Sequence, residues 1–127
     1  MTVYLSGDLG AGKTALARAI LRGLGYTGRV KSPTYTLVED YVVSSLYLYH
    51  FDLYRFDDPR EWLDAGFDEY LTANSLCLVE WPEKAAGCLP APDLWIHLEI
   101  QEHGRLAGIE AKTEKGAQCL QRLKTKP

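Results

Sequence analysis

The chain has 127 residues, of which 46% are hydrophobic and 24% are charged, a size and composition typical of a globular domain. Its 14 basic and 17 acidic side chains give a net charge of -3, which argues against a protein that binds nucleic acid alone through a broad positive surface. Apolar runs stay below the roughly 20 residues that a membrane-spanning helix needs, and Met1 leads into a strand-like segment and not into a signal peptide. We therefore expect one domain over residues 1–127, located in the cytoplasm without membrane association.

The first predicted elements are a strand and a helix joined by a glycine-rich turn. Residues 2–6 are apolar and lead directly into Gly7, which begins the turn. Apolar side chains then recur at helical spacing over residues 14–24, and Gly25 supplies a stop signal. We therefore expect a strand, a glycine loop and an amphipathic helix, followed by a loop over residues 31–36.

Apolar runs separated by short polar turns predict the rest of the fold. The expected elements are a hairpin over residues 37–43 and 46–54, one or two short helical turns over residues 59–71 that are interrupted at Gly66, a buried strand over residues 75–81, a second hairpin over residues 94–100 and 106–111, and a helix over residues 114–123. Together they predict an α/β fold in which a central, mostly parallel sheet carries antiparallel hairpins and flanking helices.

The segment Gly7–Thr14, GDLGAGKT, matches the phosphate-binding motif G-x-x-x-x-G-K-[ST]. Its position between a strand and a helix favours this interpretation over an ordinary glycine turn, because backbone N–H groups and the helix dipole then face a phosphate. Lys13 is expected to reach the β- and γ-phosphates, and the Thr14 hydroxyl to bind Mg²⁺. We therefore predict a single small P-loop NTPase-like domain that binds ATP or ADP with Mg²⁺. The residues expected to contact the nucleotide here are Asp8, Leu9, Gly10, Ala11, Gly12, Lys13, Thr14 and Ala15.

Two acidic residues end apolar strands and are candidates for the second half of the site. Asp52 lies in YHFDLYR and Glu80 ends LCLVE, each at the mouth of a hydrophobic strand where an unpaired charge is costly. For either residue alone, a solvent-facing carboxylate or a pair with Arg55 is the alternative. We expect Lys13 and Mg²⁺ to neutralise charge on ATP, while Asp52 or Glu80 orients the attacking water.

Further candidates lie in the loop after the first helix and beside the acidic residues. The hydroxyls of Thr34 and Thr36 occupy the chain position of a nucleotide-sensing switch loop, although a proline turn with capping hydroxyls is the alternative. Trp81 follows Glu80 and is expected to line the site. His50 lies inside a strand, where a structural histidine is commoner than a catalytic base.

Four motifs in order resemble the bacterial TsaE family. They are GDLGAGKT at residues 7–14, SPTYTLV at residues 32–38, HFDLYR at residues 50–55 and EWPE at residues 80–83. The first motif is shared by P-loop proteins in general, whereas the other three together are specific. Family members usually carry a further strand and helix before the P-loop strand, so we expect this chain to lack those two elements, because six residues precede Gly7.

The resemblance implies a small P-loop α/β domain that hydrolyses ATP slowly. It also implies that TsaB and TsaD are partners and that tRNA is reached through their complex, which modifies tRNA beside the anticodon. Lys13 and Thr14 would then hold phosphate and metal, Glu80 would complete the metal shell, and Asp52 would be needed for turnover. A non-catalytic, nucleotide-dependent assembly switch and a small-molecule kinase are alternatives, although a kinase would be expected to carry an arginine-rich lid.

Overall fold

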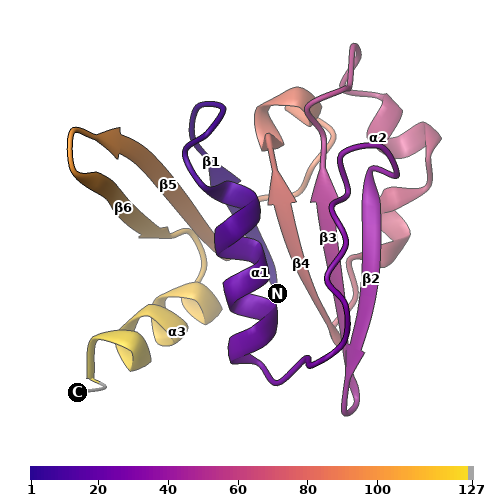
Figure 1. Cartoon of the computed structure of the whole chain (residues 1–127). Coiled ribbons are helices and arrows are strands. Elements are labelled where there is room, and N and C mark those ends of the chain that lie inside the picture. The colour runs from indigo at the N-terminus through magenta and orange to yellow at the C-terminus, as the bar shows by residue number, and fades with distance from the viewer. Residues whose placement is uncertain (126–127) are drawn as a thin grey trace.

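The computed structural model in Figure 1 describes residues 1–125, which form an α/β domain around one mixed sheet. The six strands of the sheet lie in the order β2-β3-β4-β1-β5-β6. The elements are β1 (Thr2–Ser6), α1 (Lys13–Gly23), β2 (Val38–Val43), β3 (Leu46–Asp52), α2 (Glu61–Asp64), the 3₁₀ helix η1 (Phe67–Tyr70), β4 (Ser75–Glu80), the 3₁₀ helix η2 (Pro82–Ala85), β5 (Leu94–Gln101), β6 (Gly104–Ala111) and α3 (Glu114–Thr125).

The centre of the sheet is parallel and both of its edges are antiparallel, as predicted. Strands β3, β4, β1 and β5 pair in parallel, so their carboxyl ends meet at one edge of the sheet. The hairpins β2–β3 and β5–β6 add an antiparallel strand at each side. A parallel sheet places loops that follow its strands close together, and ligands of such folds bind there.

Successive side chains of β1 point to opposite faces of the sheet, and each face has its own apolar cluster. Val3 and Leu5 join an apolar cluster with Ala17 of α1, whereas Tyr4 belongs to a cluster on the opposite face with Phe51 and Trp62. Figure 1 shows α1 lying across the front of the sheet, with α2 on the other side. The strand before the glycine loop is therefore packed on both faces, which holds the start of that loop firmly.

Several predicted boundaries differ from the observed ones for local reasons. Helix α1 ends at Gly23, and Leu24, predicted to be its last apolar contact, is 42% exposed. Strand β3 ends at Asp52, two residues early, because the chain then turns: the Tyr54 N–H donates to the Asp52 side chain at 3.0 Å and the Phe56 N–H donates to the Leu53 carbonyl at 3.0 Å. Strand β6 begins at Gly104, two residues before the prediction, since Gly104 pairs with Gln101 and adopts φ +102°.

The two short helical turns predicted between residues 59 and 71 are present as α2 and η1, with Gly66 between them at φ +73°. The predicted final helix is α3. Within residues 1–125, none of the helices combines the length and the apolar character needed to cross a membrane.

We expect Trp62→Ala to destabilise the domain strongly. Trp62 is fully buried, and its ring centroid lies 4.9 Å from that of Phe51 and 5.5 Å from that of Phe67. Loss of a buried aromatic side chain typically costs about 3–5 kcal/mol, because it leaves a cavity. Urea unfolding followed by circular dichroism measures the change. The control is the adjacent Leu63→Ala, which removes a side chain that is 49% exposed and should change stability by less than about 1 kcal/mol.

Candidate functional site

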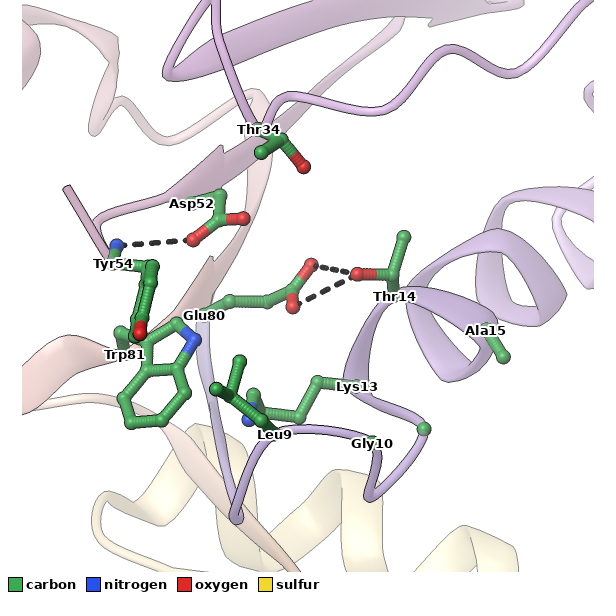
Figure 2. Close-up of a pocket in the computed structure, with 11 residues that line it drawn as sticks. Leu9, Gly10, Lys13, Thr14, Ala15, Thr34, Asp52, Tyr54, Glu80 and Trp81 are labelled. Carbon is green, nitrogen blue, oxygen red and sulfur yellow. Dashed lines mark hydrogen bonds between the residues drawn. The ribbon is translucent and has the colours of Figure 1, made fainter.

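A cavity of about 390 Å³ lies at the carboxyl edge of the parallel strands, where the glycine loop meets the ends of β3 and β4 (Figure 2). It combines backbone from the loop with acidic, hydroxyl and aromatic side chains from four separate segments. The lining residues are Leu9, Gly10, Gly12, Lys13, Thr14, Ala15, Thr34, Asp52, Tyr54, Glu80 and Trp81.

The backbone of the glycine loop needs glycine at two positions, Gly7 and Gly12. A Cβ at Gly7 would lie 2.6 Å from the Leu98 carbonyl oxygen of β5, and Gly7 has φ +154°. Gly12 precedes α1 at φ +103°, a conformation that side chains disfavour. The chain can therefore enter α1 directly from a tight turn, with the first N–H groups of the helix at the cavity.

Lys13 is buried at the start of α1 and points back over the loop. Its ammonium group donates to the carbonyl oxygens of Gly7 and Asp8, the latter at 3.0 Å, and lies 4.0 Å from the centroid of the Trp81 ring. Burial lowers the pKa of Lys13, and the nearby carboxylates, with Glu80 the strongest, oppose that shift. The cation is thus held at the cavity by groups that an incoming phosphate can replace.

Thr14, Glu80 and His50 form a buried chain of polar contacts. The Thr14 hydroxyl lies 3.0 Å from each Glu80 carboxylate oxygen, and Figure 2 shows the two side chains facing each other across the cavity. His50 Nε2 lies 2.5 Å from Glu80 Oε2, so Nε2 is the ring nitrogen that donates to the Glu80 carboxylate. Within residues 1–125, His50 Nδ1 has no hydrogen-bond partner. His50, which we expected to be structural, therefore orients the carboxylate of Glu80.

Strand register places Asp52 beside Glu80. The two residues are direct partners in the parallel pairing of β3 with β4. Asp52 Oδ1 accepts a hydrogen bond from the Tyr54 N–H at 3.0 Å. Burial raises the pKa of Asp52 above its ordinary value, and the charge of Glu80 adds to the shift, while the Tyr54 N–H opposes it. A carboxyl group in this environment is well suited to exchange a proton or to hold a water molecule.

Trp81 closes one side of the cavity in a strained backbone conformation. It has φ +58°, which is rare for a bulky residue, and Pro82 follows it to start η2. Its ring lies 5.0 Å from that of Tyr54. Sequence reasoning singled out Trp81 but missed Tyr54, whose only signal was its place two residues after Asp52. Arg55, considered as a partner for an acid, instead lies 4.9 Å from the ring of Tyr35.

The loop between α1 and β2 brings one of its two expected hydroxyls to the cavity. Thr34 lines the cavity, whereas Thr36 donates to Glu39 at 3.0 Å. Asp8 and Ala11 lie in the glycine loop but are not among the lining residues, and the Ala11 N–H donates to the Asp8 carbonyl at 3.0 Å. The other expected contacts from this loop, Leu9, Gly10, Gly12, Lys13, Thr14 and Ala15, all line it.

Oxygen donors at the cavity suit Mg²⁺ when they act together with phosphate. The Thr14 hydroxyl and the Glu80 carboxylate converge, and both are hard oxygen ligands. In the described part of the chain, no group of three or more His, Cys, Asp or Glu side chains could hold a metal by itself. A cation at Thr14 and Glu80 would therefore need phosphate oxygens or water as further ligands, which is how proteins usually bind Mg²⁺.

Several curated proteins of known pathway are similar to this chain in sequence. The chain is 48% identical over 114 residues to the tRNA threonylcarbamoyladenosine biosynthesis protein TsaE of Haemophilus influenzae, which covers 90% of this chain and 72% of that protein. It is 46% identical over 92 residues to the TsaE protein of Bacillus subtilis, covering 72% of this chain and 57% of the relative. With the Rickettsia felis TsaE protein the identity is 41% over 109 residues, covering 84% of this chain and 63% of the relative.

A solved structure shows the same fold. The crystal structure of Bacillus subtilis YdiB superimposes with a TM-score of 0.80 at 31% identity, covering 97% of this chain and 76% of that one. Residues 1–107 match the family model described as threonylcarbamoyl adenosine biosynthesis protein TsaE, so the match extends beyond the EWPE motif into the β5–β6 hairpin. This chain therefore belongs to the TsaE family.

Proposed function

We propose that this chain is a P-loop ATPase that binds and slowly hydrolyses Mg-ATP in the threonylcarbamoyladenosine modification of tRNA, acting with TsaB and TsaD in the cytoplasm. The observation that carries the ATPase proposal is the contact of Thr14, the last residue of the phosphate-binding motif, with Glu80 at the end of β4. The tRNA role rests on family membership and on the printed names of the relatives, which describe tRNA threonylcarbamoyladenosine biosynthesis. The proposal that TsaB and TsaD are partners rests on the resemblance of the four motifs to those of the family.

In the proposed reaction, water attacks the γ-phosphorus of ATP and the bond from that phosphorus to the β–γ bridging oxygen breaks. The products are ADP and phosphate, and the proton of the attacking water leaves through a carboxylate or solvent. Lys13 exchanges the Gly7 and Asp8 carbonyls for phosphate oxygens and balances their charge. Thr14 and Glu80 would hold Mg²⁺, which when bound neutralises charge on the phosphates.

Of the two acids, Asp52 is better placed to orient the water. The two Glu80 oxygens share the single hydroxyl hydrogen of Thr14, and one of them also accepts from His50. Asp52 has one oxygen on the Tyr54 N–H, while its Oδ2 has no hydrogen-bond partner within the described residues. We therefore assign the metal to Glu80 and the water to Asp52, with Thr34 as a further polar neighbour.

A nucleotide-dependent assembly switch is the second candidate, favoured by the loop over residues 31–37. Tyr41 holds one end of this loop through bonds to the Lys31 backbone at 3.0 and 3.1 Å, and the Leu37 N–H closes the other end on the Pro33 carbonyl at 2.8 Å. Between these anchors Tyr35 is 82% exposed, beside the cavity residue Thr34. Nucleotide could therefore change a surface that a partner contacts.

Direct tight binding of tRNA is not part of the proposal. Tight binding to a nucleic-acid backbone draws on several free Lys or Arg side chains. The local group of basic residues is Arg18, Arg22, Arg29 and Lys31, and Arg22 already donates to the carbonyls of Tyr26 at 3.0 Å and Gly28 at 2.6 Å. This chain would instead act on tRNA through its complex with TsaB and TsaD.

The first experiment measures phosphate release from ATP by this chain alone and with TsaB and TsaD. We expect partner-stimulated release, and partner binding that differs among ATP-analogue, ADP and nucleotide-free conditions in native mass measurements.

Lys13→Ala should reduce nucleotide affinity or turnover by at least about tenfold, because the loop loses its mobile cation. Lys115→Ala, which removes an exposed lysine of α3, is the control.

Unchanged ATP affinity and turnover in Lys13→Ala would remove the P-loop assignment. Nucleotide-dependent assembly without phosphate release would favour the switch, and phosphate transfer to an added metabolite would favour a kinase. Submicromolar tRNA affinity of the chain alone would contradict the indirect route to tRNA.

The second experiment tests the metal assignment with Glu80→Gln. The amide keeps the size of the side chain but loses its charge, so the Mg²⁺ concentration that gives half-maximal turnover should rise by about tenfold or more. Folding should be affected less than the magnesium response. Glu114→Gln removes the same charge from an exposed position at the start of α3 and should leave the magnesium titration unchanged. An identical magnesium titration in wild type and Glu80→Gln would contradict metal binding by Glu80 and would assign it to Asp52.

The third experiment uses the raised pKa of Asp52. An acid whose pKa is raised on folding destabilises the folded state once it ionises, so its cost is absent below about pH 3.8 and is complete above its folded-state pKa. Asp52→Asn removes this cost and keeps an oxygen for the Tyr54 N–H. We expect the variant to melt roughly 2–6 °C above wild type at pH 7, with turnover lost, and the difference to shrink as the pH falls toward 4.

Thermal melts of both proteins between pH 4 and pH 8 measure this difference. Asp57→Asn, at an exposed position, serves as the control and should show little change across the range. A variant that is less stable than wild type at pH 7, or a difference that does not vary with pH, would contradict the expected cost of the buried carboxylate.

A further inference from the structure

Arg105, near the tip of the β5–β6 hairpin, contacts the centre of the phosphate-binding loop from the side opposite the cavity residues of β3 and β4. Its Nε donates to the Ala11 carbonyl at 3.1 Å and its Nη2 to the Gly10 carbonyl at 3.0 Å. The remaining nitrogen, Nη1, donates to the Gly104 carbonyl at 3.0 Å and so holds the guanidinium against its own hairpin. The sequence offered no signal for this contact, since Arg105 stands 94 residues from Ala11.

The hairpin also meets the loop at a second point. The Leu98 carbonyl of β5 occupies the space that a side chain at Gly7 would need, with an oxygen 2.6 Å from the ideal Cβ position. Figure 1 shows the β5–β6 hairpin beside the indigo loop that joins β1 to α1. The hairpin therefore supports the loop at its first residue through backbone contact and at its centre through Arg105.

The geometry of the peptide bond gives these contacts a consequence for phosphate binding. In a trans peptide the C=O and the N–H of the next residue point in opposite directions. A guanidinium that holds the Ala11 carbonyl outward therefore turns the Gly12 N–H the other way, and Gly12 lines the cavity. Within the described residues the Gly12 N–H has no hydrogen-bond partner, so it is available to an anion.

Lys13 and Arg105 bond four different carbonyls of the loop. Lys13 takes those of Gly7 and Asp8, and Arg105 takes those of Gly10 and Ala11. Lys13 must leave its carbonyls in order to reach a phosphate, whereas Arg105 approaches from the hairpin and can stay in place. Arg105 reaches its two carbonyls through two nitrogens of a planar fork, whose fixed orientation a single ammonium group does not reproduce.

We propose that Arg105 is a positioning residue for phosphate binding, which keeps the Gly10–Gly12 backbone in the conformation that presents N–H groups to the phosphates of a nucleotide. The proposal rests on the proposed nucleotide-binding function. It makes the hairpin part of the site although none of its residues lines the cavity. Any partner that displaces the hairpin would then weaken phosphate binding without touching the nucleotide.

The test compares Arg105→Ala and Arg105→Lys with wild type, using Lys112→Ala as the control. Lys112 follows β6 directly, and its ammonium pairs with Glu110 at 2.6 Å, so the control removes a positive charge from the same edge of the sheet. Titrations with ADP and with inorganic pyrophosphate measure affinity. We expect Arg105→Ala to weaken both by about tenfold, Arg105→Lys to weaken both by less, and Lys112→Ala to leave both unchanged.

A second readout needs no ligand and separates this proposal from the proposed function. Nitrogen-15 relaxation of the nucleotide-free proteins should show order parameters at Ala11 and Gly12 falling from about 0.85 toward 0.6 in Arg105→Ala, with the denaturant midpoint nearly unchanged. Failure of the wild-type chain to bind ADP would overturn the proposed function, while the relaxation data would still decide the role of Arg105.

Wild-type affinity and unchanged order parameters in Arg105→Ala would overturn the proposal. So would a loss of ADP affinity without a loss of pyrophosphate affinity, because Arg105 would then act on the nucleoside and not on the phosphate loop. If Arg105→Ala does not fold, Arg105→Lys still decides, since it keeps the charge and the stem of the side chain and loses only the planar fork.

Discussion

The parallel pairing of β4 with both β1 and β3 is the constraint on which the site depends. It sets Glu80 opposite Leu5 on one side and opposite Asp52 on the other, so that the loop after β1 and the two carboxylates share one edge of the sheet. A slip of one residue in either pairing would turn a carboxylate to the opposite face, because side chains alternate along a strand. A slip between β1 and β4 would separate Thr14 from Glu80, and a slip between β3 and β4 would separate Asp52 from Glu80.

The buried polar groups at this edge depend on one another. Lys13, His50, Asp52 and Glu80 are all largely removed from water, which for a single charge would be costly. Here one carboxylate accepts from a hydroxyl and an imidazole, and the ammonium group lies on backbone carbonyls and an indole ring. The raised pKa of Asp52 and the left-handed backbone of Trp81 indicate that this edge carries some destabilising features, as binding sites commonly do.

The phosphate loop is held by contacts that are far apart in the sequence. Its entrance is fixed by β1, its exit by α1, and four of its carbonyls by Lys13 and Arg105. The two cations differ in kind, since Lys13 begins the helix that follows the loop and Arg105 joins the loop to the β5–β6 hairpin. The role proposed for Arg105 follows from this contact between an exposed hairpin outside the cavity and the centre of the loop.

The sequence by itself determined the features that depend on neighbouring residues. The phosphate loop occupies eight consecutive positions, and the hairpins and short helices follow from local periodicity and turns, so the α/β fold with a mostly parallel sheet was predictable. Asp52 and Glu80 were recognisable as strand-end acids, but their different hydrogen-bond partners were not. Only the tertiary structure joined Thr14 to Glu80, gave His50 its carboxylate and brought Arg105 to the loop. These contacts depend on strand order and register, which arise from the packing of the whole sheet and leave no local pattern in the chain.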